Sequence, residues 1–492
     1  MEQTEHRTDA PSAPAPAAPR TGSVIALLVA SAFVVILNET IMSVALPSLM
    51  DDLDITANTA QWLTTGFMLT MAVVIPLTGF LLARFPLRNV YFTAMTLFAA
   101  GTLIAALSPG FAMLLAGRVV QASGTAMMMP LLFTTVLTLV PAAHRGRMMG
   151  VITIVIAVAP AIGPTVSGLI LSTLDWRFMF WLVLPIALTA LALGAIWVRN
   201  VTETRPAKLD VPSVVLSALG FGALIFGLSS IGESASGHAP VPVWIPLVVG
   251  GVSLLAFVLR QLRLQKRDAA LLDLRTFRSR TFALATVLVA VVFGALFGTL
   301  VMLPIYLQQV RGLDTLAVGL MLLPGGVLMG VLGPIVGSLF DRFGPTPLVI
   351  PGMTVTAGSL WIMSALGETT PLAWVVGAHL ALNLGLGFVF TPLMTSALGS
   401  LPRRLYPHGS ATVGTIQQLA GAAGTALFVT LMSVQAADSL ASGAGAVTAT
   451  ADGVHHAFVI GAIITSAAVL VALLVRRPAE PVEGDALPIA AH

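Results

Sequence analysis

Long apolar stretches follow one another along almost the whole chain, with short charged connections between them. A helix that crosses a lipid bilayer needs about 20 apolar residues, because hydrocarbon offers no partners to backbone N–H and C=O groups. Fourteen stretches of 18 or more residues contain no Asp, Glu, Lys or Arg. They lie at 21–38, 55–83, 89–117, 119–144, 148–174, 178–198, 211–232, 234–259, 281–310, 315–340, 343–367, 369–402, 405–437 and 453–475. The pattern predicts an all-α membrane protein with fourteen transmembrane helices, the first of which continues through 40–50.

The composition agrees with this class and excludes others. Of 492 residues, 57% are hydrophobic and 9% are charged, whereas soluble domains carry about 25% charged residues. The absence of Cys excludes disulfides and thiolate metal sites. The two lysines, Lys208 and Lys266, lie in no Gly-rich phosphate loop, so the chain has no site for ATP hydrolysis. We expect no enzymatic activity, no metal and no cofactor.

The positions of the basic residues predict the orientation. If the N-terminus is placed in the cytoplasm, 21 Lys and Arg fall on the inner connections, two (Arg177 and Arg311) on the outer ones, and Arg118 within a span. Because inner loops carry the excess of basic residues, we expect a multi-pass protein of the plasma membrane with both termini in the cytoplasm.

The connections and ends differ in composition from the spans. Residues 1–20 are rich in Pro and Ala and are expected to be a disordered cytoplasmic tail, and 478–492 a similar one. The connection 260–280 is basic and amphipathic, which predicts a segment on the anionic inner leaflet. Its charges would determine topology or bind a specific lipid.

The order of residues in two connections indicates an internal repeat. Gly79 to Arg88 reads GFLLARFPLR, and Gly337 to Thr346, 258 residues later, reads GSLFDRFGPT. A charged turn between spans explains the Arg but not the shared G-x-x-x-x-R-F order. No repeated filter segment of a channel is visible. The repeat therefore favours a secondary carrier, since carriers are commonly built from repeats around a central site.

These features resemble the major facilitator superfamily, in particular its fourteen-span drug:proton antiporter branch. The repeated connection is similar to the cytoplasmic gate signature G-x-x-x-D-R-x-G, although Ala83 and Pro86 replace its Asp and Gly in the first copy. The segment 37–47 (LNETIMSVALP) is similar to a signature at the end of the first span, with the acid one place later. Asp175-Trp-Arg177 is also common in this branch. The resemblance assigns the gate to Gly79, Arg84, Arg88, Gly337, Asp341 and Arg342.

Two further motifs carry the resemblance. The segment 115–124 (LAGRVVQASG) matches a proton-coupling signature, and 159–168 (APAIGPTVSG) resembles the Gly-Pro signature of exporters. A helix bends where Pro removes a hydrogen bond, so we expect a bend at Pro160, Gly163, Pro164 and Gly168. Ordinary tight packing against another helix is the alternative.

The resemblance implies the domain organisation and the activity. It predicts the major facilitator fold, with six-helix bundles at 21–198 and 281–477 and two inserted helices with a basic linker at 199–280. The implied function is proton-coupled antiport that exports lipophilic or cationic drugs by alternating access. The alternative is a carrier of the same fold for one endogenous metabolite or lipid. We expect a monomer whose partners are its substrate, protons and membrane lipids, with no nucleic acid.

Two charged residues interrupt otherwise charge-free spans, namely Glu39 and Arg118. Ionised groups in hydrocarbon cost about 2.5–3.5 kcal/mol or more, which makes them functional candidates. At about 1.5 Å per residue, both lie some 10–12 Å inside the outer face, so they can pair if their helices are neighbours. The hypothesis is that Glu39 carries the proton and Arg118 tunes it; a static ion pair is the alternative.

Further residues are candidates for a substrate cavity. Met127, Phe293 and Phe297 would form a pliable wall, although such residues also face lipid. His379 and Asn383 lie one turn apart, where His379 either meets substrate or proton or is a hydrogen-bonded core group. Gln417 lines a cavity or bonds to another helix. The predicted cavity residues are Asn38, Gln121, Met127, Phe293, Phe297, His379, Asn383 and Gln417.

Overall fold

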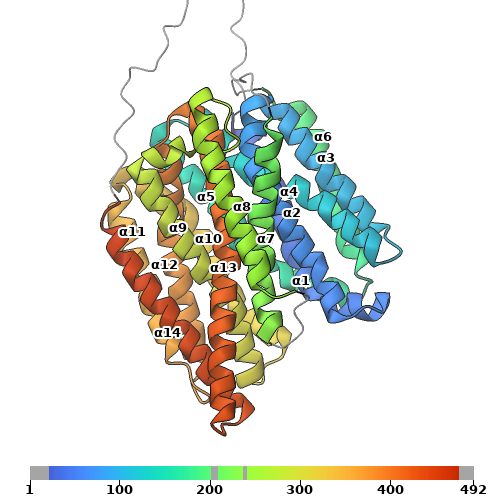
Figure 1. Ribbon diagram of the computed structural model, residues 1–492, viewed down its shortest axis with the longest axis vertical. Helices are drawn as coiled ribbons and strands as arrows, with labels where there is room; N and C mark the ends of the chain where they lie inside the picture. The colour runs from blue at the N-terminus through green and yellow to red at the C-terminus, as the bar shows by residue number, and fades with distance from the viewer. Residues whose placement is uncertain (1–20, 201–208, 236–240, 476–492) are drawn as a thin grey trace, which may run out of the picture.

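A computed structural model of the chain describes residues 21–200, 209–235 and 241–475, and these residues form fourteen long α-helices (Figure 1). The helices are α1 (Thr21–Leu53), α2 (Ala57–Arg84), α3 (Leu87–Ala106), α4 (Phe111–Leu139), α5 (Arg145–Leu171), α6 (Arg177–Trp197), α7 (Val211–Ala235), α8 (Trp244–Leu264), α9 (Arg280–Ile305), α10 (Thr315–Phe343), α11 (Thr346–Ser364), α12 (Leu372–Gly399), α13 (Tyr406–Ala441) and α14 (Ala446–Ala472). All fourteen are long and apolar enough to cross a membrane. The predicted fold class is confirmed; the predicted tails lie outside the described residues.

Local sequence explains where several helices begin and end. The Asp314 side chain accepts a hydrogen bond from the Ala317 N–H at 2.9 Å and thereby caps the start of α10. The same helix ends at Gly344, whose φ of +80° is unfavourable for residues with a side chain. That glycine belongs to the second copy of the repeated connection, so it allows the chain to turn sharply into α11.

Helices α1–α6 pack on one another in one group, and α9–α14 in a second. In Figure 1 the first group is blue to cyan, and the second is yellow to red. We call the end of the molecule at which α1 begins and α14 ends the termini end, and the opposite end the far end. The helices of each group run alternately between these two ends.

Two helix pairs make the most extensive contacts between the groups. Helix α5 packs along α10, and α2 packs along α13. Helix α7 contacts both α2 and α13, and α8 packs on α7, so this pair lies over the α2–α13 seam (Figure 1). Trp62 of α2 stacks on Phe226 of α7 with ring centroids 5.8 Å apart, which places apolar surface of α7 against the first group.

The connection after α8 folds back against the helices. Gln261 of α8 is fully buried and donates to Ser213 Oγ at 2.7 Å. Its Oε1 accepts from the backbone N–H groups of Leu271 and Leu272 at 2.8 and 3.3 Å. Leu271 and Leu272 are buried in an apolar cluster with residues of α2, α7, α8 and α13. Part of the connection 260–280 is therefore buried between helices, because Gln261 supplies the bonds that anchor Leu271 and Leu272 there. The prediction that the connection lies on the inner leaflet stays a prediction.

Candidate functional site

The two charges singled out within the spans lie on neighbouring helices. Glu39 is on α1 and Arg118 is on α4, and these helices contact each other. Arg118 follows the first residue of α4 by seven positions, which places it roughly 10 Å below the far end of that helix. The two groups therefore lie in the far half of the first helix group.

Arg118 is 1% exposed and is held by neutral groups. One terminal nitrogen, Nη1, donates to Gln121 Oε1 at 2.7 Å and to Asn38 Oδ1 at 3.2 Å. The guanidinium also lies over the Phe67 ring, 4.0 Å from its centroid, an arrangement that stabilises a cation. Its Nε is buried and has no hydrogen-bond partner among the described residues. A desolvated cation with an unused donor favours an anion beside it.

Glu39 is half-buried beside this cation. Its carboxylate and the Arg118 guanidinium interact electrostatically, but within the part of the chain that the structure describes no ion pair joins them at 4.0 Å or less. The preceding residue, Asn38, is the one that contacts Arg118. In this conformation the two charged groups are therefore not in direct contact.

Gln121 and Asn38 pack inside the first helix group. Gln121 is fully buried and donates from Nε2 to Thr102 Oγ1 of α3 at 2.7 Å while its Oε1 accepts from Arg118. Asn38 is 1% exposed. Both side chains therefore position Arg118 in this conformation, between α1, α3 and α4.

The Gly-Pro sequence of α5 adjoins the same site. Helix α5 is continuous from Arg145 to Leu171. A Cβ built at Gly163 would lie 2.3 Å from Oγ1 of Thr40, the neighbour of Glu39, so a glycine is needed for α1 to approach α5 here. Gly168 has open space around its Cα, and Pro160 is half-buried.

The remaining predicted cavity residues are distributed over α4, α9, α12 and α13. Phe293 and Phe297 of α9 stack with centroids 6.1 Å apart, and Phe293 also contacts Phe390 of α12 at 5.6 Å. Met127 is 5% exposed in the same continuous apolar core. Gln417 of α13 is half-buried and its Nε2 lies 3.6 Å from Met394 Sδ.

His379 and Asn383 of α12 lie against α10. His379 Nε2 is 3.2 Å from the Leu322 carbonyl oxygen, and Asn383 Nδ2 donates to the His379 carbonyl oxygen at 2.9 Å. A Cβ at Gly325 would lie 2.5 Å from the His379 ring. The pair fills the space that this glycine leaves, and within the described chain no hydrogen bond links it to Arg118 or Glu39.

The second copy of the repeated connection contacts the other helix group. Asp341 of α10 accepts hydrogen bonds from the backbone N–H groups of Gly146 and Arg147, at 2.7 and 2.9 Å. These N–H groups open α5 and have no partners within that helix, so a carboxylate is favourable there. Gly337, one turn earlier, meets Gly146 so closely that an added Cβ would lie 2.1 Å from the Gly146 carbonyl oxygen.

The first copy makes a different contact. At Gly79 of α2 an added Cβ would lie 3.2 Å from Ala411 Cβ and 3.3 Å from His408 Nδ1, both of α13. Arg88 donates to the Ala195 carbonyl oxygen of α6 at 3.2 Å, inside its own helix group. Arg84 and Arg342 are exposed, and Arg342 lies over its neighbour Phe343. Of the six predicted gate residues, Gly79, Gly337 and Asp341 lie between the helix groups.

Other contacts between the groups were missed in the sequence. Gly146 and Gly150 of α5 face Gly333 and Gly337 of α10, and a Cβ at Gly150 would lie 2.1 Å from the Gly333 carbonyl oxygen. Both pairs have the G-x-x-x-G spacing typical of close helix contacts in membranes, which is the signal that identifies them. Arg145 Nη1 also donates to the Tyr406 hydroxyl at 3.1 Å.

Two pairs of hydroxyl groups also join the two helix groups. Thr153 Oγ1 and Thr391 Oγ1 are 2.7 Å apart, and Thr134 Oγ1 donates to Ser410 Oγ at 3.3 Å. Within the described ranges, the hydrogen bonds that join the two helix groups and whose donor and acceptor atoms are each oxygen or nitrogen lie in the half nearer the termini end. The molecule is held closed at that end.

A separate cluster fixes the far end of the first group. Arg177 forms an ion pair with Asp52 at 3.1 Å and donates to the Ser108 carbonyl oxygen at 3.2 Å. Trp176 Nε1 donates to Asp52 at 2.9 Å. This hydrogen bond, with that from Arg177, lowers the pKa of Asp52. The Asp-Trp-Arg sequence at the start of α6 thus connects α1, α6 and the α3–α4 turn.

Comparison with known proteins agrees with this architecture. Residues 28–425 match the family model of the Major Facilitator Superfamily. The lincomycin resistance protein LmrB of Listeria monocytogenes is 43% identical over 459 residues, covering 92% of this chain and 96% of that protein. LmrB of Bacillus subtilis is 40% identical, covering 92% and 95%.

A solved structure shares the fold. The human organic anion transporter MFSD10 superimposes with a TM-score of 0.68 at 13% identity, over 92% of this chain and 100% of that one. At this identity the likeness concerns the fold alone. The family match and the two resistance proteins confirm the resemblance found in the sequence. The chain is a member of the major facilitator superfamily of multi-pass membrane transporters.

Proposed function

We propose that this transporter is a proton-coupled antiporter that exports lipophilic or cationic drugs across the plasma membrane by alternating access. The observation that carries the proposal is the buried Arg118 guanidinium, held by neutral amides with an unused Nε, beside the half-buried acid Glu39. The similarity to two lincomycin resistance proteins supports a drug as the exported compound.

The proposed coupling depends on the distance between two charges. A carboxylate close to a guanidinium releases its proton more readily, and one that is desolvated without that partner retains it. Glu39 therefore binds a proton where the two side chains are apart and releases it where a conformational change brings the carboxylate to Arg118 Nε. Substrate and proton would alternate at this site, which gives exchange.

The orientation belongs to the same proposal. The excess of basic residues on the connections at the termini end favours a cytoplasmic location for that end. The conformation described here would then be closed to the cytoplasm, with Glu39 nearer the outer face. Asp341 on the start of α5, and Gly337 and Gly79 at their helix contacts, would act as the cytoplasmic gate.

The test is transport into proteoliposomes under an imposed pH gradient, with lincomycin and the lipophilic cation tetraphenylphosphonium as probes. Wild type is expected to accumulate a probe against its gradient. Glu39→Gln is expected to accumulate no probe uphill, because it carries no exchangeable proton. Glu368→Gln is the matched control, since Glu368 is an exposed acid of the α11–α12 connection at the far end, and it should transport normally.

Two results would contradict the proposal. Uphill accumulation at the wild-type rate by Glu39→Gln would show that Glu39 does not couple transport to the gradient. Accumulation that does not depend on the pH gradient would show that the coupled ion is not the proton. Breaking a buried charge arrangement can also unfold a protein, so the unfolding temperature of each variant is measured alongside. Transport of one compound in a broad panel would favour a dedicated carrier over a drug exporter.

A further inference from the structure

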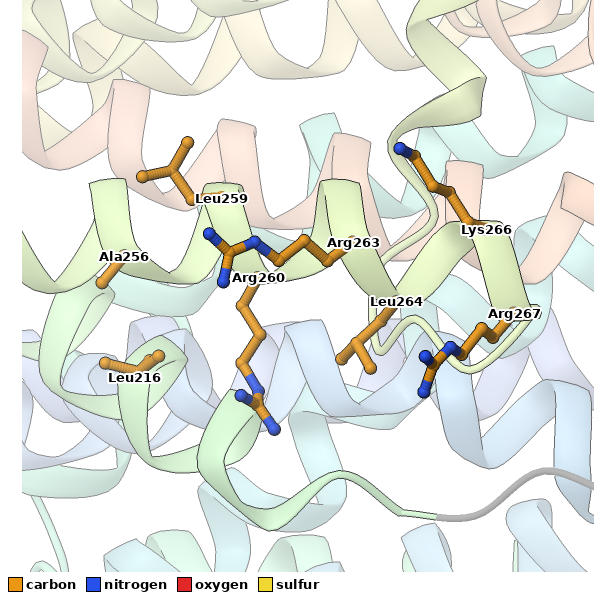
Figure 2. Close-up of a pocket in the computed structure, with 8 residues that line it drawn as sticks. All are labelled: Leu216, Ala256, Leu259, Arg260, Arg263, Leu264, Lys266 and Arg267. Atoms are coloured by element: carbon orange, nitrogen blue, oxygen red, sulfur yellow. The ribbon is translucent and has the colours of Figure 1, made fainter.

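A groove lined by basic residues lies at the termini end of the inserted helices, and neither Glu39 nor the predicted gate residues line it. Its volume is about 680 Å³. Four apolar residues and four cations line it, with Leu216 from α7 and the others from α8 and the turn that follows (Figure 2). The lining residues are Leu216, Ala256, Leu259, Arg260, Arg263, Leu264, Lys266 and Arg267.

Of the four cations that line the groove, one is paired with an acid among the described residues. Arg260 is paired with Asp210, with Nε–Oδ2 and Nη2–Oδ1 distances of 2.6 and 2.7 Å. Asp268, the next acid along the connection, is paired with Arg275. In contrast, Arg263, Lys266 and Arg267 are exposed and form no ion pair within the described chain. Among the described residues, the groove therefore carries three cations without a counter-charge.

The apolar side of the groove continues along α8. Leu259, Leu255 and Val252, at successive turns of the helix, are 51%, 61% and 63% exposed. A transmembrane helix with such an exposed apolar face turns it toward hydrocarbon. The groove thus lies where the hydrocarbon-facing surface of α8 gives way to its basic last turns, at the depth of lipid headgroups.

We propose that this groove binds an anionic phospholipid, with the phosphate at Arg263 and Arg267 and an acyl chain along Leu259 and Leu255. Guanidinium groups bind phosphate oxygens through paired hydrogen bonds. In Figure 2 Arg260 and Arg267 extend to the same side of α8, Arg263 runs back along the helix toward Leu259, and Lys266 extends to the other side. Lys266 therefore adds to the positive charge of the surface rather than contacting the headgroup. A free phosphate would satisfy the arginines but would leave the apolar wall unused.

The test uses the full chain purified in detergent and titrated with dioleoylphosphatidylglycerol, with bound lipid counted by native mass spectrometry. The double variant Arg263→Gln/Arg267→Gln is expected to bind this lipid about 25-fold more weakly, since each basic side chain near an anionic lipid contributes a factor of about 5. Arg263→Lys/Arg267→Lys, which keeps the charge but loses the fork of donors, should lose only a few-fold. Phosphatidylcholine, with no net charge, should bind at least tenfold more weakly than phosphatidylglycerol.

The matched control is Arg403→Gln/Arg404→Gln. These exposed arginines lie in the η5 turn (Arg403–Leu405) before α13, also at the termini end but outside the groove. This variant removes the same charge and should bind phosphatidylglycerol within twofold of wild type. An equal loss in both double variants would overturn the site in favour of general surface charge. Glycerol 3-phosphate that displaces the lipid at similar concentrations would overturn it in favour of a free phosphate.

Discussion

The carboxylate of Asp341 joins the two helix groups at the termini end, so its removal should open that end. Asp341→Asn keeps the shape of the side chain but loses the charge and one of the two acceptor oxygens that bind the Gly146 and Arg147 N–H groups. A hydrogen bond to a charged group is worth about 1.5–3 kcal/mol against about 0.5–1.5 for a neutral one. Because Asp341 is half-exposed, we take about 2 kcal/mol, a factor of about 30 in the ratio of closed to open molecules.

The absence of cysteine in the chain makes the measurement direct. Ala143 and Arg403 are exposed positions at the termini end of different helix groups. Spin labels on Ala143→Cys and Arg403→Cys report the distance between them by pulsed electron paramagnetic resonance. Asp341→Asn should shift the distance distribution toward longer values. The neighbouring variant Arg342→Gln, an exposed residue that bonds to no described residue of the other group, should not. An unchanged distribution in Asp341→Asn, or the same shift in both variants, would refute the reasoning.

Two further predictions follow from the packing and the surface charges. Gly150→Ala should separate α5 from α10 and lower the unfolding temperature, because the added Cβ would lie 2.1 Å from the Gly333 carbonyl oxygen. Gly168→Ala on the same helix has open space around its Cβ and should leave the unfolding temperature unchanged. Equal effects of the two variants would contradict the close contact. The Arg260 guanidinium lowers the pKa of Asp210 to about 2, so this carboxylate stabilises the folded protein above pH about 4 and loses its contribution as the pH falls toward 2. The difference in unfolding temperature between wild type and Asp210→Asn should therefore shrink over that range, and a constant difference would rule the contribution out.

The sequence predicted the helices well and their partners less well. The fourteen charge-free stretches form fourteen helices, because the backbone in lipid must satisfy its own hydrogen bonds. This requirement makes nearly every residue of a span apolar, so the whole stretch indicates the helix. Which helices meet depends on a few small residues, and the spacing of Gly146, Gly150, Gly333 and Gly337 identifies a contact surface without naming its partner.

Polar side chains were harder to place than helices. Gln121 and Gln261 are both glutamines near basic residues, yet the first holds Arg118 and the second anchors the connection after α8. Hydropathy cannot distinguish a polar residue that faces a cavity from one that bonds inside a bundle, because both interrupt an apolar stretch in the same way. The neighbourhood of Glu39 and Arg118 was predictable because two charges at matching depth are rare in spans.

The inserted pair of helices restricts how a lipophilic molecule can reach the centre of the protein from the side. Two helix–helix interfaces, α5–α10 and α2–α13, run along the boundary between the two helix groups. Helix α7 lies across the second of them, against both α2 and α13. Helix α7 would block access from the bilayer to the interface between α2 and α13. Sideways entry is then left to the α5–α10 interface, where the glycines allow the two backbones to touch or part with little side-chain rearrangement.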